Sequence, residues 1–152
     1  MANQKGRISG GGGLRRSVGI RDAGRHRDQG RRDVVAFRAD AGWFFANAAT
    51  IKEHLDHVLA TRSVPPGLVV IDMGSAPLLD FGAIAVLSDL RQELSVDGTD
   101  LRFANLYAQS QKMMLAADPA FAPLLPNRSI GEAIADWDSG PATTTSTAEK
   151  QR

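Results

Sequence analysis

The stretch that decides the fold is "LVVIDMGSAPLLDFGAIAVLSDL", residues 68–90. Residues 68–73 are almost continuously apolar, which is typical of a central strand covered on both faces. A short loop follows, and residues 83–95 then place isoleucine and leucine side chains at helical spacing. The succession of strand, loop and helix predicts an α/β domain with this strand at its centre.

The loop before this helix carries acidic residues but no reactive group at its tip. The tip reads Asp80, Phe81, Gly82, Ala83, without a hydroxyl, thiol or imidazole. Two interpretations are open for Asp80 and for Asp72, which ends the strand. The two carboxylates either hold a cation together, or Asp80 caps the next helix by accepting hydrogen bonds from its free N–H groups. Capping is the more common role for an acid at this position.

Elements on both sides of this unit complete the predicted fold. Residues 34–38 and 101–106 have the pattern of strands, and residues 51–59, 110–117 and 129–137 that of helices. The order predicts a small α/β sandwich. We expect a mixed central sheet of about four to five strands, with about four helices mainly on one side.

The segment "GWFFA", residues 42–46, is rich in aromatic side chains and is predicted to be extended. Phe44 and Phe45 would then point to opposite faces, so at least one of them should lie in the core. Asn47 has the residue type of an N-cap for the helix that follows.

The length of 152 residues suits one domain with tails. We expect a disordered, basic, glycine-rich tail over residues 1–19, a linker over 20–33, the domain over 34–138 and a disordered threonine-rich tail over 139–152. The chain has no cysteine, which excludes disulfides and thiol catalysis. No apolar run approaches the ~20 residues of a membrane-spanning helix.

Charge is divided unevenly along the chain. Residues 1–33 contain nine Lys or Arg and three Asp, a formal charge of +6, whereas residues 34–152 carry −5. A basic tail suits an anionic membrane, a nucleic acid or simply a flexible linker. Four consecutive glycines and the lack of aromatic residues for base stacking favour the linker, so no nucleic-acid partner is expected.

Few side chains in the sequence suggest catalysis or metal binding. His54 and His57 lie three residues apart on a predicted helix without an evident third ligand, which favours a solvated helix face. No Ser/His/Asp set and no paired-carboxylate signature is present, so we expect neither an enzyme nor a metal site.

With these elements in order, the sequence resembles a STAS domain. It is most similar to the version at the cytoplasmic C-terminus of SulP sulfate and anion permeases, and more distantly to anti-sigma factor antagonists. The most specific match is "VVAFRADAGWFFANAA", residues 34–49, with Phe44, Phe45 and Asn47 inside the family signature. Residues 20–30, "IRDAGRHRDQG", resemble the connection to the last membrane helix; residues 68–94 and 98–106 also fit.

The resemblance implies a non-enzymatic regulatory domain that binds a protein. The implied partner is a membrane anion transporter or another STAS-interacting protein, with a cytoplasmic location at the inner face of the membrane. The alternative is a stand-alone signalling protein, like the antagonists, that binds a kinase-type partner. Nucleotide binding is known for some members of the family and is implied by the resemblance only; no residue here points to a cofactor.

In the antagonists the loop reads D-S-S-G-L, and a kinase phosphorylates one of the serines. Aligned on this sequence, the serine positions fall on Phe81 and Gly82, and the glycine falls on Ala83. The loop tip therefore cannot accept a phosphate. We expect Asp72, Asp80 and this tip to form an interaction loop, with Phe81 exposed beside a helix N-terminus. Such a surface suits contact with a protein or with an anion.

Overall fold

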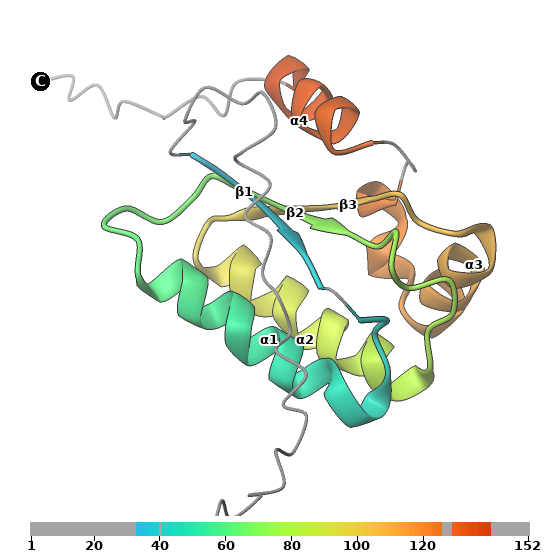
Figure 1. Cartoon of the computed structure of the whole chain (residues 1–152). Helices are drawn as coiled ribbons and strands as arrows, with labels where there is room; N and C mark the ends of the chain where they lie inside the picture. The colour runs from blue at the N-terminus through green and yellow to red at the C-terminus, as the bar shows by residue number, and fades with distance from the viewer. Residues whose placement is uncertain (1–32, 40, 126–128, 141–152) are drawn as a thin grey trace, which may run out of the picture.

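The computed structural model describes residues 33–39, 41–125 and 129–140. Three parallel strands form one sheet in the order β1-β2-β3 (Figure 1). The strands are β1 (Val34–Arg38), β2 (Leu68–Asp72) and β3 (Asp100–Ala104). The helices are α1 (Phe45–Ala60), α2 (Phe81–Val96), α3 (Ala108–Ala117), the 3-10 helix η2 (Pro119–Leu124) and α4 (Ile130–Ser139).

The central strand β2 is covered on both faces, as its apolar sequence predicts. All five of its residues are buried. Val69 and Ile71 belong to the main core under α1 and α2, whereas Leu68 and Val70 belong to a smaller cluster with α4. Because successive side chains of a strand alternate between faces, a strand buried on both sides needs apolar residues at nearly every position.

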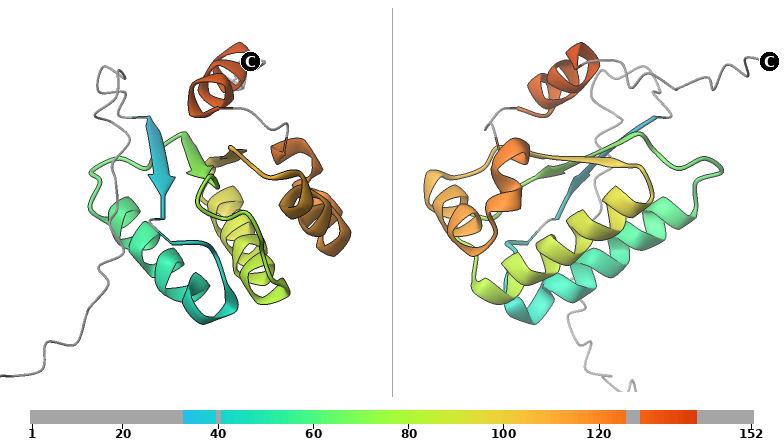
Figure 2. Two further views of the ribbon diagram at one scale, coloured as in Figure 1. Left: turned by 45° about the vertical axis from the view of Figure 1, so that its right-hand side comes forward. Right: turned by 180° about the vertical axis from the view of Figure 1, so that it is seen from behind.

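The helices lie mainly on one face of the sheet. Helices α1 and α2 run side by side beneath it, and α4 lies on the opposite face (Figures 1 and 2). The predicted α/β class and the predominance of helices on one side are confirmed. The described residues contain three parallel strands instead of a mixed sheet of four to five. The tail predicted over 1–19, most of the linker over 20–33, and residues 141–152 of the tail predicted over 139–152 lie outside the described residues. Ser139, the first residue of that second tail, is the last residue of α4.

The inward faces of the two long helices follow their apolar periodicity. In α1, Ile51 and Leu55 are buried, with Val58 and Leu59 packed against the same core. In α2, the four predicted inward residues are all buried: Ile84, Leu87, Leu90 and Leu94. Helix α4 begins with a capping box, in which the side chains of Ser129 and Glu132 accept hydrogen bonds from each other's backbone N–H groups.

The prediction for the aromatic segment before α1 is wrong. Helix α1 already begins at Phe45, so this segment is not a strand. Phe44 and Phe45 are 46% and 78% exposed, and Trp43 is the aromatic residue that is fully buried. Asn47 is the third helical residue and not the N-cap, which is Phe44. The helix starts earlier than the pattern indicates because its first turn is capped from another part of the chain.

We predict that Trp43 contributes far more to stability than its aromatic neighbours. Trp43→Ala should lower the free energy of unfolding by about 3–5 kcal/mol, the range for removing a buried aromatic side chain. Phe45→Ala, at an exposed position, should change it by less than about 0.5 kcal/mol. Denaturant unfolding of the two variants measures both values. Equal losses would contradict the placement of Trp43 in the core.

Candidate functional site

One carboxylate joins the first turns of two helices. Asp80 is the N-cap of α2, and its Oδ1 accepts a hydrogen bond of 2.8 Å from the Ala83 N–H. The same carboxylate accepts from the N–H of Phe45, the first residue of α1, at 3.0 Å and 2.8 Å to its two oxygens. Asp80 therefore caps α2 locally and α1 from 35 residues away.

The local sequence of α1 explains why it needs an external cap. Phe44 stands at the N-cap position and has no side-chain oxygen to offer. Asn47 compensates in part, because its Oδ1 accepts from the Phe44 N–H at 2.8 Å and its Nδ2 donates to the Gly42 carbonyl at 2.8 Å. The N–H of Phe45 is still left without a local acceptor, and the Asp80 carboxylate accepts its hydrogen bond.

These contacts keep Asp80 ionised. Hydrogen bonds from the backbone N–H groups of Phe45 and then Ala83 lower the pKa of the Asp80 carboxyl below its ordinary value. Each helix N-terminus carries a partial positive charge, and the carboxylate lies where an anion would bind. A phosphate or sulfate ion approaching these two helix ends would therefore meet a negative charge.

Asp72 takes part in a separate network at the carboxyl end of the sheet. It is buried, and its Oδ1 accepts hydrogen bonds of 2.9 Å from both the Gly74 N–H and the Asn105 Nδ2. Its Oδ2 lies 3.5 Å from Nη1 of Arg38. Arg38 ends β1 and Asn105 follows β3, so Asp72 ties together the ends of all three strands.

The arrangement favours the capping role of Asp80 over a cation shared by Asp72 and Asp80. Asp72 and Asp80 belong to different hydrogen-bond networks. Within the part of the chain that the structure describes, no group of three or more His, Cys, Asp or Glu side chains is placed to hold a metal ion.

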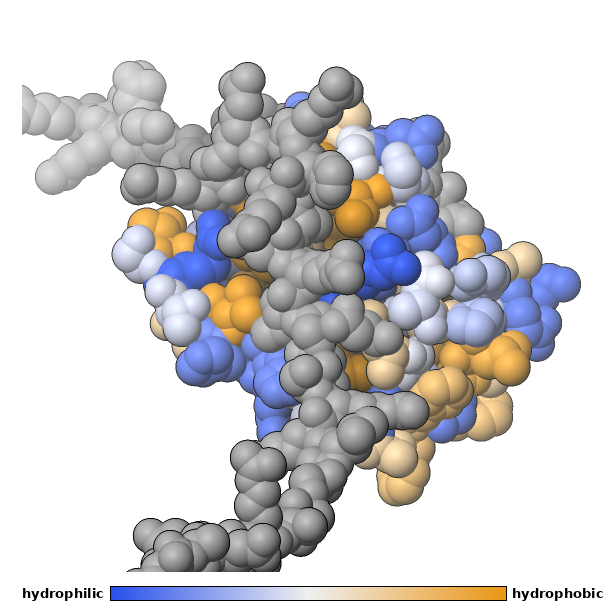
Figure 3. All heavy atoms as spheres, viewed as in Figure 1, coloured by the Kyte–Doolittle hydropathy of each residue, from blue (hydrophilic) through white to orange (hydrophobic). Residues whose placement is uncertain are grey.

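Exposed apolar side chains gather around the Asp80 cap. Phe81, at the start of α2, is 72% exposed, as expected for the loop tip. Because β1 and β2 are parallel and each leads into a helix, the first turns of α1 and α2 lie at the same end of the sheet (Figures 1 and 2). The exposed Phe44 and Phe45 are the N-cap and the first residue of α1. Figure 3 shows apolar residues at the lower right, where these helix ends lie. We call this surface the aromatic end; its exposed residues are Phe44, Phe45, Leu78, Phe81 and Tyr107.

Gly82 and Ala83, which correspond to serine and glycine in the antagonists, are closely packed. A Cβ atom added at Gly82 would lie 2.8 Å from both the Cβ and the Cδ2 of Phe45. Ala83 is fully buried. A side chain at position 82, where the resemblance places a serine, would therefore require Phe45 or the first turn of α2 to shift.

The structure brings the predicted loop residues and the aromatic signature residues together. Asp80 accepts a hydrogen bond from the Phe45 N–H, and Gly82 lies against the Phe45 side chain, although the two segments lie far apart in the sequence.

Other residues at this end of the sheet were not predicted from the sequence. They are Leu78, Arg38 and Tyr107, whose hydroxyl donates a hydrogen bond to the Gly74 carbonyl at 3.2 Å. All three follow or end parallel strands, or lie in the loops after them. Their positions after predicted strands are the sequence signal that could have placed them at one shared end of the sheet.

Comparison with known proteins identifies the family. The family model described as STAS domain matches residues 27–118, more than half of the chain, and the chain belongs to that family. No curated protein matches the sequence. Among the described residues, no helix combines the length and the apolar character needed to cross a membrane.

Solved structures share this fold at low sequence identity. A sulfate transporter family protein from Wolinella succinogenes superimposes with a TM-score of 0.57 at 18% identity, covering 70% of this chain and 85% of that one. The STAS domain of a SulP transporter from Vibrio cholerae gives 0.57 at 15%, covering 70% and 81%. The murine Solute Carrier 26 family member A9 anion transporter gives 0.60 at 16%, but 70% of this chain covers only 18% of that transporter. The fold is that of transporter STAS domains.

We predict that loss of Asp80 destabilises the domain more than loss of an ordinary cap. Ser129→Ala removes the single cap of α4 and should lower the free energy of unfolding by about 1 kcal/mol. Asp80→Ala uncaps two helices and should lower the free energy of unfolding by more than Ser129→Ala does. The loss for Asp80→Asn should lie between those of Ser129→Ala and Asp80→Ala, because one side-chain oxygen remains to accept hydrogen bonds. Denaturant melts give the order. A smaller loss for Asp80→Ala than for Ser129→Ala would contradict the double cap.

The same carboxylate predicts a pH dependence. Its folded pKa is lowered, so the unfolded chain takes up the proton first as the pH falls. The stabilisation by Asp80 should be complete above its ordinary pKa of 3.8 and should disappear as the pH falls further, through the lowered folded pKa. The difference in stability between the wild-type chain and Asp80→Asn, measured from pH 6 downward, should shrink only in that acidic range. A difference that shrinks near neutral pH would exclude this origin.

Close packing at Gly82 predicts that restoring a serine is unfavourable. Gly82→Ser should destabilise the chain by about 1–3 kcal/mol, the usual range for overpacking, and should shift the amide signals of Phe45. Gly131 holds the same second position in α4, and a Cβ atom added there would meet no other atom within 4 Å. Gly131→Ser should therefore be neutral or slightly stabilising. Equal effects of the two changes would show that α1 does not restrict position 82.

Proposed function

We propose that this chain is a non-enzymatic regulatory domain that binds a protein partner through its aromatic end. The observation that carries the proposal is the concentration of exposed aromatic side chains on two helix ends that one carboxylate holds together. Aromatic residues on a rigid support are the usual anchors of protein interfaces, because they bury a large area without ordering a mobile segment.

The chemistry of the aromatic end supports binding and not catalysis. Within the described residues, it presents Asp80 engaged in caps and Tyr107 bonded to a carbonyl, without an adjacent base and nucleophile. His54 and His57 lie further along α1, in its second half. The ionised Asp80 disfavours anion contact between the helix ends, which leaves protein contact as the better-supported of the two expected roles.

The relatives suggest the kind of partner. The structures with the same fold include sulfate and anion transporter proteins. We therefore propose a membrane anion transporter of the SulP type as the partner, which would place the domain at the cytoplasmic face of the membrane. The tight contact at Gly82 argues against a phosphorylation cycle of the kind that the antagonists use.

The proposal predicts which side chains are needed for binding. The test uses the full chain and the detergent-purified membrane portion of a SulP permease from the same organism, with binding followed by calorimetry. Phe81→Ala and Phe45→Ala should each weaken binding roughly tenfold or more, as expected for interface anchors. Val96→Ala, which truncates an 87% exposed side chain at the far end of α2, should leave it unchanged.

Two results would overturn the proposal. One is equal weakening by Val96→Ala and Phe81→Ala, which would place the interface elsewhere. The other is tight binding to an anti-sigma factor kinase from the same organism and none to the permease, which would favour the stand-alone signalling role.

A further inference from the structure

A second surface lies at the opposite end of α1 and α2. A groove of about 520 Å³ separates the last turns of the two helices, at the amino end of the sheet. Its apolar part is formed by Leu59, Leu90 and Leu94 with two prolines. Its acidic part is formed by Asp56, Glu93 and Asp97. We call it the acidic groove.

The charges around this groove are only partly balanced. Lys52 Nζ lies 2.8 Å from Asp56 and 2.7 Å from Glu93, so it offsets one of these acids. Asp97 is the C-cap of α2, and the last turn of that helix has no basic residue. Each helix C-terminus adds a partial negative charge, so acids there are unfavourable unless a cation lies nearby.

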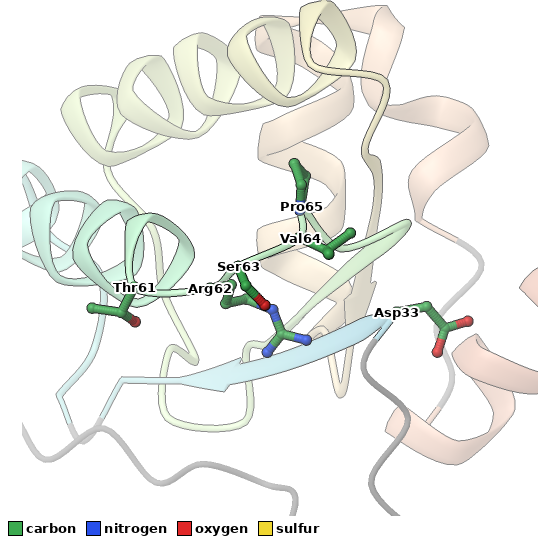
Figure 4. Close-up of a pocket in the computed structure, with 6 residues that line it drawn as sticks. All are labelled: Asp33, Thr61, Arg62, Ser63, Val64 and Pro65. Atoms are coloured by element: carbon green, nitrogen blue, oxygen red, sulfur yellow. The ribbon is translucent and has the colours of Figure 1, made fainter.

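The domain begins directly beside the acidic groove. The Asp33 carbonyl accepts hydrogen bonds from the backbone N–H groups of Gly67 and Leu68 at 2.7 Å and 3.0 Å, which fixes where the chain enters the sheet. Asp33 also lines a second hollow of about 460 Å³ with the residues that connect α1 to β2 (Figure 4). This hollow shares Arg62 and Pro65 with the acidic groove, so the two are neighbours.

The balance of charge is negative. Around the acidic groove, Asp56, Glu93 and Asp97 carry three negative charges, and Arg62 and Lys52 carry two positive ones, which leaves one negative charge before the helix ends are counted.

The segment that precedes the domain has the complementary charge. Residues 15–32 contain seven arginines and two aspartates. They join the domain at Asp33. When extended, 18 residues span up to about 60 Å, which is longer than the distance across one end of a domain of this size.

We propose that residues 15–32 bind back onto the acidic groove of their own domain. The contact is intramolecular, so ion pairs that are individually weak act at an effective concentration in the millimolar range. It offsets the charge of the basic segment and holds it at the amino end of the sheet, opposite to the aromatic end. This inference is independent of the proposed function, because it concerns another surface and another binding partner.

The experiment uses the full chain with a nitroxide spin label. Because the chain has no cysteine, Ala23→Cys provides a single attachment point within the segment. At about 0.02 M salt, the label should broaden the amide signals of Ala60, Leu94 and Thr99, which line the groove. Broadening should fall by about half or more near 1 M salt, where screening acts within about 3 Å.

A matched pair of charge reversals distinguishes binding in the acidic groove from a general effect of the domain's charge. Asp97→Lys places a cation at the C-terminus of α2, which the helix dipole favours, so the domain stays folded. It should reduce the broadening at least about twofold. Asp89→Lys makes the same change at an exposed position of α2 outside the groove, and should leave the broadening unaltered.

Three outcomes would overturn the proposal: equal effects of the two reversals, broadening of the aromatic end or of α4 in place of the groove, and broadening that does not respond to salt.

Discussion

The Asp80 carboxylate is the contact on which the arrangement of the aromatic end depends. Two parallel β-α units place the amino ends of α1 and α2 side by side, where their partial positive charges repel each other. Asp80 lies between them and accepts hydrogen bonds from N–H groups of both helices. It thereby joins the first turns of α1 and α2, beside the exposed aromatic side chains of Phe45 and Phe81.

The close approach of the two helices also explains the character of the loop. Gly82 lies against Phe45, so the position that carries a serine in the antagonists is filled by packing. The loop keeps the aspartate of the antagonist motif as Asp80, whose pKa is lowered by its hydrogen bonds, but the next two residues have no hydroxyl to carry a reversible phosphate. Both features support the proposed role in constitutive contact over a phosphorylation cycle.

Parallel topology gives the two ends of the helix pair opposite properties. At the amino ends, a single acid neutralises two positive dipole ends and apolar side chains surround it. At the carboxyl ends, the dipoles are negative and further acids join them, with Lys52 as a partial counter-charge. One end is therefore suited to apolar anchors and the other to cations. The dipole directions at both ends follow from the parallel β-α-β topology, in which neighbouring helices point the same way.

The sequence by itself determined the local features: the buried strand, predicted over 68–73 and found at Leu68–Asp72, the inward faces of α1 and α2, the favoured role of Asp80 as the cap of α2, and the STAS resemblance. Each is set by residues close together in the chain, through periodicity or capping chemistry. Only the tertiary structure decided where α1 begins, that Trp43 is buried while Phe44 and Phe45 are exposed, and that Gly82 packs against Phe45. Those outcomes depend on contacts between segments that are far apart in the chain, such as the hydrogen bond between Phe45 and Asp80, 35 positions apart, and no local pattern records such a contact.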